Sequence, residues 1–185
     1  LRAIALSQGR WRAAWRLALP LALSGWYLAT VACHLTAGVT GSDPFGYVQM
    51  AHDLLAHGSP RHYYPLAALA ARLGIATWPT VPIGYNPPVE GGAVAGWPPG
   101  WPALLALAMG LGGEQGLLWL APLCHLGAAA CAGLLGAELA PQERSARYAI
   151  GGLAGALLLT SYEGVTRSLV PMADGPERLR IDPPD

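Results

Sequence analysis

Two long stretches of the chain carry no charged side chain. Residues 17 to 42 and residues 115 to 137 contain no Asp, Glu, Lys or Arg. A helix that crosses a hydrocarbon core of ~30 Å needs about 20 predominantly apolar residues. Both stretches are long enough, so the pattern predicts transmembrane helices over 17–41 and 115–137.

A third apolar stretch begins after the polar segment 138–147. Residues 148 to 162 are free of charge, and the apolar character continues toward Met172. The stretch reaches spanning length only by including Glu163 and Arg167, which lie near its end, where long side chains can reach the membrane interface. The pattern therefore predicts a third transmembrane helix over 148–172.

The region between the first two stretches, 42–114, is rich in Pro and Gly, which break it into turns and helices too short to span a membrane. Residues 44 to 57 read as an amphipathic helix, with Asp43 at the N-cap and Pro44 at the first helical position. Its expected apolar face contains Val48, Ala51, Leu54 and Leu55, and its polar face contains Gln49, His52, Asp53 and His57.

The segment 102–113 is apolar but short, since about 12 residues at 1.5 Å each give roughly 18 Å. We expect it to lie in the interface rather than to cross the membrane. Whether segment 102–113 crosses the membrane decides the topology. If it does not cross, Asp43 and Asp174 lie on the same face of the membrane. If it crosses, they lie on opposite faces.

Arginine is distributed unevenly along the chain. Arg2, Arg10, Arg12 and Arg16 precede the first predicted span, and no acid accompanies them. The positive-inside rule then places 1–16 in the cytoplasm, 42–114 outside, 138–147 in the cytoplasm and 173–185 outside. A signal peptide over 1–37 is the alternative, but its apolar run is too long and lacks a convincing cleavage site. The sequence thus predicts an all-α polytopic membrane protein with about three transmembrane helices and interfacial helices in a large outer loop.

Composition and motifs argue against several other classes of protein and of binding site. The chain is 53% hydrophobic and 12% charged, with no net charge and no dense basic cluster, so nucleic acid is not an expected partner. Its three cysteines, Cys33, Cys124 and Cys131, fall in apolar stretches and suggest neither disulfides nor a metal site. No zinc spacing, Walker loop, dinucleotide fingerprint or nucleophile elbow is present.

Three motifs occur in a particular order relative to the predicted spans. SDPFGYVQMAHDLLAHGSP follows the first span, WPPGWPALLALAMGLGG precedes the second, and TRSLVPMADGP ends the third. Together these motifs resemble the N-terminal part of the GT-C superfamily of membrane glycosyltransferases, and most closely its protein mannosyltransferase and lipid A aminoarabinose transferase branch. The resemblance covers most of residues 17 to 176.

The resemblance implies that a sugar moves from a polyprenyl-phosphate carrier to an acceptor hydroxyl or phosphate on the non-cytoplasmic face, in a bacterial plasma membrane. The phosphate is already a good leaving group, whereas the acceptor is a weak nucleophile that needs a base. By motif position Asp43 is the expected base. Asp174 matches the second acidic position of the site, where its carboxylate would orient the acceptor. The two residues would hold a divalent metal ion if one is used. The expected substrate contacts are Tyr47, Arg61, His62 and Arg167.

Several of the polar residues also have a purely structural interpretation. Asp43 before a proline is an ordinary N-cap, and Asp174 before a glycine is an ordinary turn residue. Arg167 and Glu163 are four apart, so a local ion pair competes with binding of the lipid phosphate. His34 and His125, inside predicted spans, are expected to be neutral and bonded to neighbouring helices.

The chain departs from the family after Asp174, where a fourth span is expected and the sequence instead reads GPERLRIDPPD. We therefore expect the chain to be a fragment that is inactive alone. The rival interpretation is a non-catalytic membrane protein, such as a transporter segment or assembly partner. Transporters place polar groups near the midplane, whereas the acidic candidates here cluster at one face.

Overall fold

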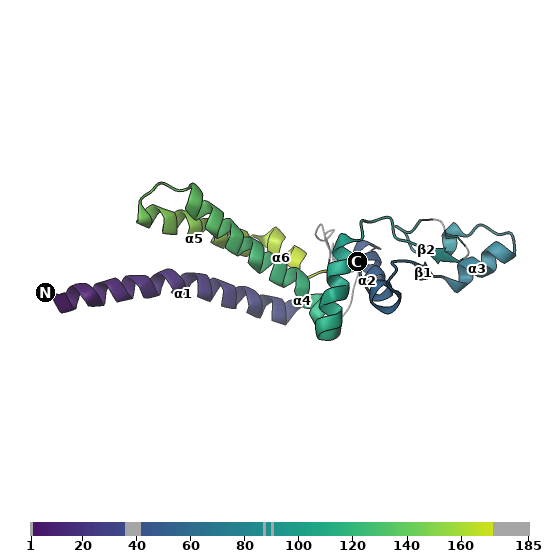
Figure 1. The fold of residues 1–185 in the computed structure, drawn as a ribbon, viewed down its shortest axis with the longest axis horizontal. Helices are drawn as coiled ribbons and strands as arrows, with labels where there is room; N and C mark the ends of the chain where they lie inside the picture. The colour runs from purple at the N-terminus through teal and green to yellow at the C-terminus, as the bar shows by residue number, and fades with distance from the viewer. Residues whose placement is uncertain (1, 36–41, 87, 90, 172–185) are drawn as a thin grey trace, which may run out of the picture. The chain divides into compact units, whose positions relative to one another are not determined.

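The computed structural model describes residues 2–35, 42–86, 88–89 and 91–171, and it is mostly helical (Figure 1). Residue Asp174 lies outside the described residues. The elements, in chain order, are α1 (Arg2–His34), α2 (Ser42–His57), β1 (His62–Tyr63), α3 (Pro65–Arg72), a 3₁₀ turn η1 (Trp78–Thr80), β2 (Gly92–Ala93), α4 (Gly100–Leu139), α5 (Arg144–Thr160) and α6 (Tyr162–Ser168).

The chain forms two compact units. Of the described residues, unit 1 contains 2–35 and 122–169, and unit 2 contains those from 42 to 121 together with 170–171. The long helix α4 contributes its first part, up to Ala121, to unit 2 and the remainder, from Pro122, to unit 1.

Unit 1 is a bundle of α1, the second part of α4, α5 and α6. Close packing between α4 and α5 depends on glycine. A methyl group added at Gly151 would stand 2.6 Å from the carbonyl oxygen of Gly133, and one added at Gly155 would stand 3.0 Å from that of Ala129. Small residues at such spacing let helix backbones approach closely, which is typical of helix pairs in membranes.

The core of unit 1 includes a polar contact between α1 and α6. Tyr27 is fully buried, and its hydroxyl donates to Oγ of Ser168 at 2.8 Å while lying 3.2 Å from the carbonyl oxygen of Pro122. Its ring contacts that of His125, with centroids 5.3 Å apart. This cluster joins helices from both ends of the sequence.

The segment predicted to be one helix over 148–172 forms two helices. The break is at Ser161, whose φ and ψ of −62° and 130° are extended. Its hydroxyl accepts a hydrogen bond from the backbone N–H of Gly164 at 3.1 Å and donates to the carbonyl of Leu158 at 2.9 Å. Ser161 is thus the N-cap of α6, and this local bonding competes with continuation of α5.

Unit 2 is built around α2, the first part of α4 and a loop region that contains α3 and a two-stranded ladder. β1 and β2 pair antiparallel, with His62 opposite Ala93 and Tyr63 opposite Gly92. The sequence predicted only short helices and turns in this region, and no strand. Strands of two residues are too short to leave a period-two pattern, so sequence periodicity could not show them.

A backbone irregularity interrupts α4 within unit 2. Gly113 has φ 62° and ψ −156°, values outside the helical region, so two helices meet there. Gly113 ends the short apolar segment 102–113 of the sequence analysis. Among the described residues, α4 is the one helix long and apolar enough to cross a membrane by length and composition.

Candidate functional site

Asp43, the expected base, lies in the first turn of α2, and its side chain is half-buried. The unpaired N–H groups of a first helical turn favour a carboxylate at this position. Pro44, the following residue, is buried. α2 begins at Ser42, so Asp43 lies inside the first turn and not at the predicted N-cap before Pro44. This position is compatible with both a helix-stabilising role and a chemical role.

Tyr47, an expected substrate contact, is 4% exposed. Its ring packs against that of Trp97, with centroids 5.7 Å apart. Trp97 in turn occupies the space beside Gly46 and Gly84, where added methyl groups would overlap the indole ring. Gly84 also has φ +93°, which side chains rarely adopt. Tyr47 thus serves the packing of unit 2 near Asp43 and does not present its ring to solvent.

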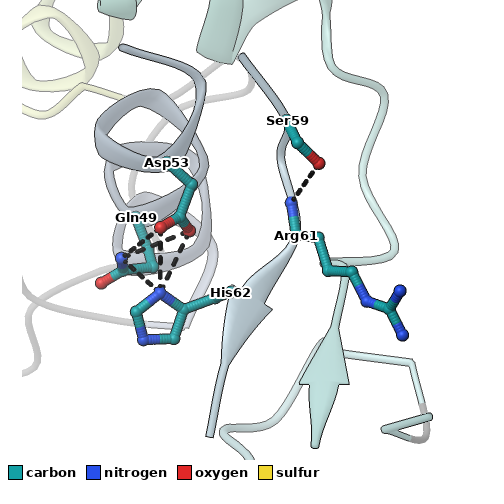
Figure 2. A network of polar contacts seen from close by, with 5 residues as sticks. All are labelled: Gln49, Asp53, Ser59, Arg61 and His62. Carbon is teal, nitrogen blue, oxygen red and sulfur yellow. Dashed lines mark hydrogen bonds and ion pairs between the residues drawn. The ribbon is translucent and has the colours of Figure 1, made fainter. Parts of the chain in front are cut away.

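A cluster of polar side chains formed by Gln49, Asp53 and His62 joins α2 to β1 in unit 2 (Figure 2). The carboxylate oxygens of Asp53 lie 3.0 and 3.2 Å from Nδ1 of His62. The amide nitrogen of Gln49 lies 2.9 Å from the same Nδ1 and 3.4 Å from both carboxylate oxygens. Three side chains from two elements therefore meet at one point.

Asp53 was expected on the solvated face of α2, and this expectation is wrong. The residue is 6% exposed, whereas Leu55, assigned to the apolar face, is 51% exposed. The face that α2 buries carries Tyr47, Met50, Ala51 and Asp53. A buried carboxylate needs hydrogen-bond or charged partners, and His62 and Gln49 supply them.

Two tyrosines extend this cluster. The ring of Tyr64 stands edge-on to His62 at a centroid distance of 4.7 Å, and Tyr85 stands edge-on to Tyr64 at 5.5 Å. Both hydroxyl oxygens are buried, and the two hydroxyls interact with each other. Burial raises the pKa of Tyr64 and of Tyr85. The hydrogen bond between the two hydroxyls lowers the pKa of Tyr64 and raises that of Tyr85, and the negative charge of Asp53 raises both. Both hydroxyls therefore keep their protons and remain donors at neutral pH.

Arg61 precedes His62 in the chain, and its side chain extends away from the Asp53 cluster (Figure 2). Its Nη2 donates to the carbonyl oxygen of Val89 at 2.7 Å, and its guanidinium crosses the face of Gly92. Successive residues of a strand point to opposite sides, which explains the separation. The structure thus does not bring Arg61 and His62, both expected substrate contacts, to one site.

Arg167 lies in unit 1, in the last turn of α6. Its Nε donates to Oε1 of Glu163 at 2.8 Å, and both side chains are largely exposed. The i, i+4 ion pair that the sequence suggested is present. Exposed pairs of this kind are worth only about 0.3–0.5 kcal/mol, so the contact leaves Arg167 able to exchange partners.

The remaining histidines have separate environments. Nε2 of His52 lies 3.4 Å from Glu114, and both side chains are solvent-accessible. Nδ1 of His34 lies 2.8 Å from the carbonyl oxygen of Thr30 in its own helix, and not from a neighbouring one. His125 contacts Tyr27 of α1 through its ring, and its buried imidazole interacts with the backbone of Leu158 and Leu159 in α5.

No group of three metal-binding side chains comes together within the described part of the chain. The expected metal pair, Asp43 with Asp174, is not tested by this because Asp174 lies outside the described residues.

Sequence reasoning did not single out Asp53 as part of a buried polar cluster. The available signal was its spacing from Gln49, because residues four apart share one helical face. That spacing could not show the face to be buried, nor could it identify His62 as the partner.

Comparisons with protein-family models, with curated proteins and with solved structures found no match for this chain.

Proposed function

We propose that the chain is embedded in a membrane, with the apolar segments 17–41, 115–137 and 148–172 in the bilayer and residues 42–114 on the outer side. A core helix of a soluble protein is mostly buried, whereas 28% of the most apolar window of α4 is buried within the protein. Leu134, Leu135 and Leu139 of α4 are 71%, 60% and 78% exposed, and Leu153 and Leu157 of α5 are 60% and 62% exposed. A lipid environment accounts for such apolar surface.

The mode of helix packing in unit 1 supports the same environment. The contact of Gly133 and Gly136 with Gly151 and Gly155 is made by backbone atoms rather than by large apolar side chains. The leucines named above point outward, whereas Gly133, Gly136, Gly151 and Gly155 face the partner helix. That distribution is the reverse of a soluble bundle, and it suits helices whose outer surface meets lipid.

We further propose that the full-length protein is a glycosyltransferase that uses a polyprenyl-phosphate sugar. The observation that carries this proposal is the position of Asp43. It lies in the first turn of α2, the first helix of unit 2 and the next helix after α1 in the chain, which is the place that the motif resemblance assigns to the base.

The proposed step is an inverting substitution at the anomeric carbon. The acceptor oxygen forms a bond to that carbon, and the bond from carbon to the carrier phosphate breaks, with its electron pair leaving on the phosphate. Asp43 takes the proton of the acceptor hydroxyl. Asp174 is proposed as a second carboxylate that orients the acceptor or shares a divalent metal ion with Asp43.

The proposed substrate contacts differ in how directly they can act. His62 and Arg61 expose part of their side chains in unit 2, and Arg167 is proposed to exchange Glu163 for the carrier phosphate. Tyr47 is buried against Trp97, so its proposed part is to support the surface beside Asp43 and not to touch the sugar.

The experiment is a transfer assay on membranes that contain the full-length protein. Polyprenyl-phosphate sugars, each with a radiolabelled sugar, are supplied one at a time, and the label is followed into lipid, glycan and protein fractions. We expect one donor to give label transfer that depends on the protein. The absence of transfer from every donor would favour the rival interpretation, a non-catalytic membrane protein.

A further inference from the structure

A group of large apolar side chains is exposed on α3 and on the turn that follows it. These side chains are between 51% and 70% exposed, and they belong to Leu66, Leu69, Leu73, Ile75 and Trp78. Because α3 and η1 contact each other, the group forms one local surface, here called the α3–η1 surface. Single apolar residues are ordinary on a protein surface, whereas a group on neighbouring elements marks a place of interaction.

α3 exposes its large side chains and buries its small ones. Ala67 and Ala70 are buried. Ala68 packs beside Gly91, where an added methyl group would stand 2.9 Å from the Cβ of Ala68. The leucines of the α3–η1 surface are spaced three and four residues apart, so they share one helical face. In a helix that covers a soluble core this face would be turned inward, and here it is turned outward.

The end of α3 fixes the chain that leads to η1. Gly74 has φ +67°, and its N–H donates to the carbonyl of Ala71 at 3.2 Å. The N–H of Ile75 donates to the carbonyl of Ala70 at 2.9 Å. These two bonds form a Schellman motif, which satisfies the last carbonyls of a helix and needs a residue that tolerates positive φ. Backbone bonds therefore set the position of Ile75 beside α3, although its side chain is not buried.

The segment that contains the α3–η1 surface carries basic residues and no acidic one. From residue 54 to residue 89 the sequence contains Arg61 and Arg72 and no Asp or Glu. Arg72 lies in the last turn of α3 and is exposed. An arginine can bind a phosphate through its guanidinium while its stem follows apolar surface. Leucines beside an exposed arginine and a tryptophan match the boundary of a bilayer, where acyl chains and phosphates meet.

We propose that the α3–η1 surface docks on the lipid bilayer in which the chain is embedded. The leucines enter the boundary between headgroups and acyl chains. Arg72 and Trp78 lie at the level of the headgroups, where soluble reagents still reach the loop between them. The proposal rests on the proposed membrane embedding and is independent of the proposed chemistry at Asp43. Because the embedded helices tether unit 2 to the bilayer, a small surface meets lipid at a high effective concentration.

The other occupants of this surface are a second copy of the chain and a different protein. In a symmetric pair, two copies would bring the same basic, acid-free segment together, so Arg72 would face like charge. A different protein would need a surface that is both apolar and acidic. A bilayer supplies apolar chains and phosphates at one boundary, so the charge of the segment favours lipid.

The test uses spin labels on the whole chain in lipid nanodiscs. Leu69→Cys, Ala71→Cys and Leu157→Cys are labelled one at a time in a variant that lacks the three native cysteines. Collisions of each label with oxygen, which concentrates in lipid, are compared with collisions with a water-soluble nickel complex. Positions 69 and 71 are both exposed and are turned about 200° from each other around α3, so they form a matched pair. Leu157, exposed on α5, tests the embedding by itself.

We expect the label at position 69 to meet oxygen and to be shielded from nickel, and the label at position 71 to meet nickel. Nickel access at both positions, with the label at position 157 in lipid, would overturn the docking and leave the embedding intact. Protection of position 69 from both reagents would show that protein covers the surface, and this would also overturn the proposal. Nickel access at position 157 would contradict the embedding and the docking that rests on it.

A second variant tests the leucine contact itself. Leu66→Gln combined with Leu73→Gln replaces two exposed side chains, so thermal stability should change little. The ratio of docked to undocked label at position 69 should fall about tenfold or more, because burial of each leucine contributes at least that factor. Ala71→Gln, on the opposite side of α3, is the matched control and should leave the label at position 69 shielded. An equally shielded label in the double variant would contradict the proposal.

Discussion

Gly151 of α5 lies against the backbone of Gly133 of α4, so closely that a methyl group on Gly151 would stand 2.6 Å from the Gly133 carbonyl oxygen. The next residue, Gly152, has no atom within 4 Å of the place where its methyl group would be. The packing of α4 against α5 thus requires glycine at position 151 but not at position 152. A matched pair of substitutions at these two positions can therefore test this packing.

Gly151→Ala is expected to destabilise the helix pair by about 1–3 kcal/mol, because the added methyl group meets backbone that cannot move aside easily. Gly152→Ala is expected to be neutral or to stabilise by up to about 1 kcal/mol, since alanine is the better helix former. Thermal unfolding of the two variants in the same detergent gives the comparison. Equal midpoints for both would show that α4 and α5 do not pack through Gly151.

The proposed membrane topology rests on the arginine distribution, from which the positive-inside rule predicts that the loop around Gln142 is cytoplasmic and that residues 42–114 are outside. Single cysteines are introduced at Ala76 or at Gln142, both exposed, in a variant that lacks Cys33, Cys124 and Cys131. A membrane-impermeant thiol reagent added to intact cells should label position 76 and leave position 142 unlabelled. Labelling of 142 but not of 76 would reverse the topology.

Tyr64 and Tyr85 lead to a prediction at alkaline pH. Burial raises the pKa of both hydroxyls above the ordinary value of 10.0. Their contribution to stability is therefore complete below pH 10 and is lost as the pH rises, because the unfolded chain releases these protons first. The tyrosinate absorbance of the wild type minus that of a variant with both Tyr64→Phe and Tyr85→Phe should rise above pH 10.0. A difference signal centred at or below that value would show that the two rings are not buried as described.

Several features of unit 2 could be predicted from local sequence. Asp43 and Pro44 predicted the start of α2 to within two residues, because capping and a fixed φ act on the nearest residues, but the helix begins at Ser42 and includes Asp43. The end of the segment 102–113 at Gly113 follows from the glycine pair there. Such signals involve neighbours in the sequence, and no tertiary partner is needed to interpret them.

The features that sequence reasoning missed depend on distant partners. Asp53 looks solvated on a helical wheel, because the residue that justifies its burial, His62, lies in a strand of two residues that has no periodic pattern. The break at Ser161 was overlooked for a different reason. Ser161 followed three residues later by Gly164 is an ordinary N-cap arrangement, but it sits within an apolar stretch that hydropathy alone reads as continuous.

The proposed base is tested most directly by substituting Asp43 in the full-length protein and measuring sugar transfer from the polyprenyl-phosphate donor. Asp43→Asn keeps much of the hydrogen bonding of a first-turn residue but cannot accept the acceptor proton, so turnover should fall roughly 100-fold or more with expression unchanged. Asp43→Glu should also be impaired, because an extra methylene moves the carboxylate by about 1 Å.

Glu114→Gln is the matched control, since it neutralises another carboxylate of unit 2, exposed and paired with His52, that has no proposed part in the chemistry. Its turnover should equal that of the wild type. The ratio of turnover in Asp43→Asn to that in Glu114→Gln therefore decides whether Asp43 is the base. A ratio of roughly 0.01 or less is predicted, and a ratio near one would show that Asp43 is a helix cap and not the base.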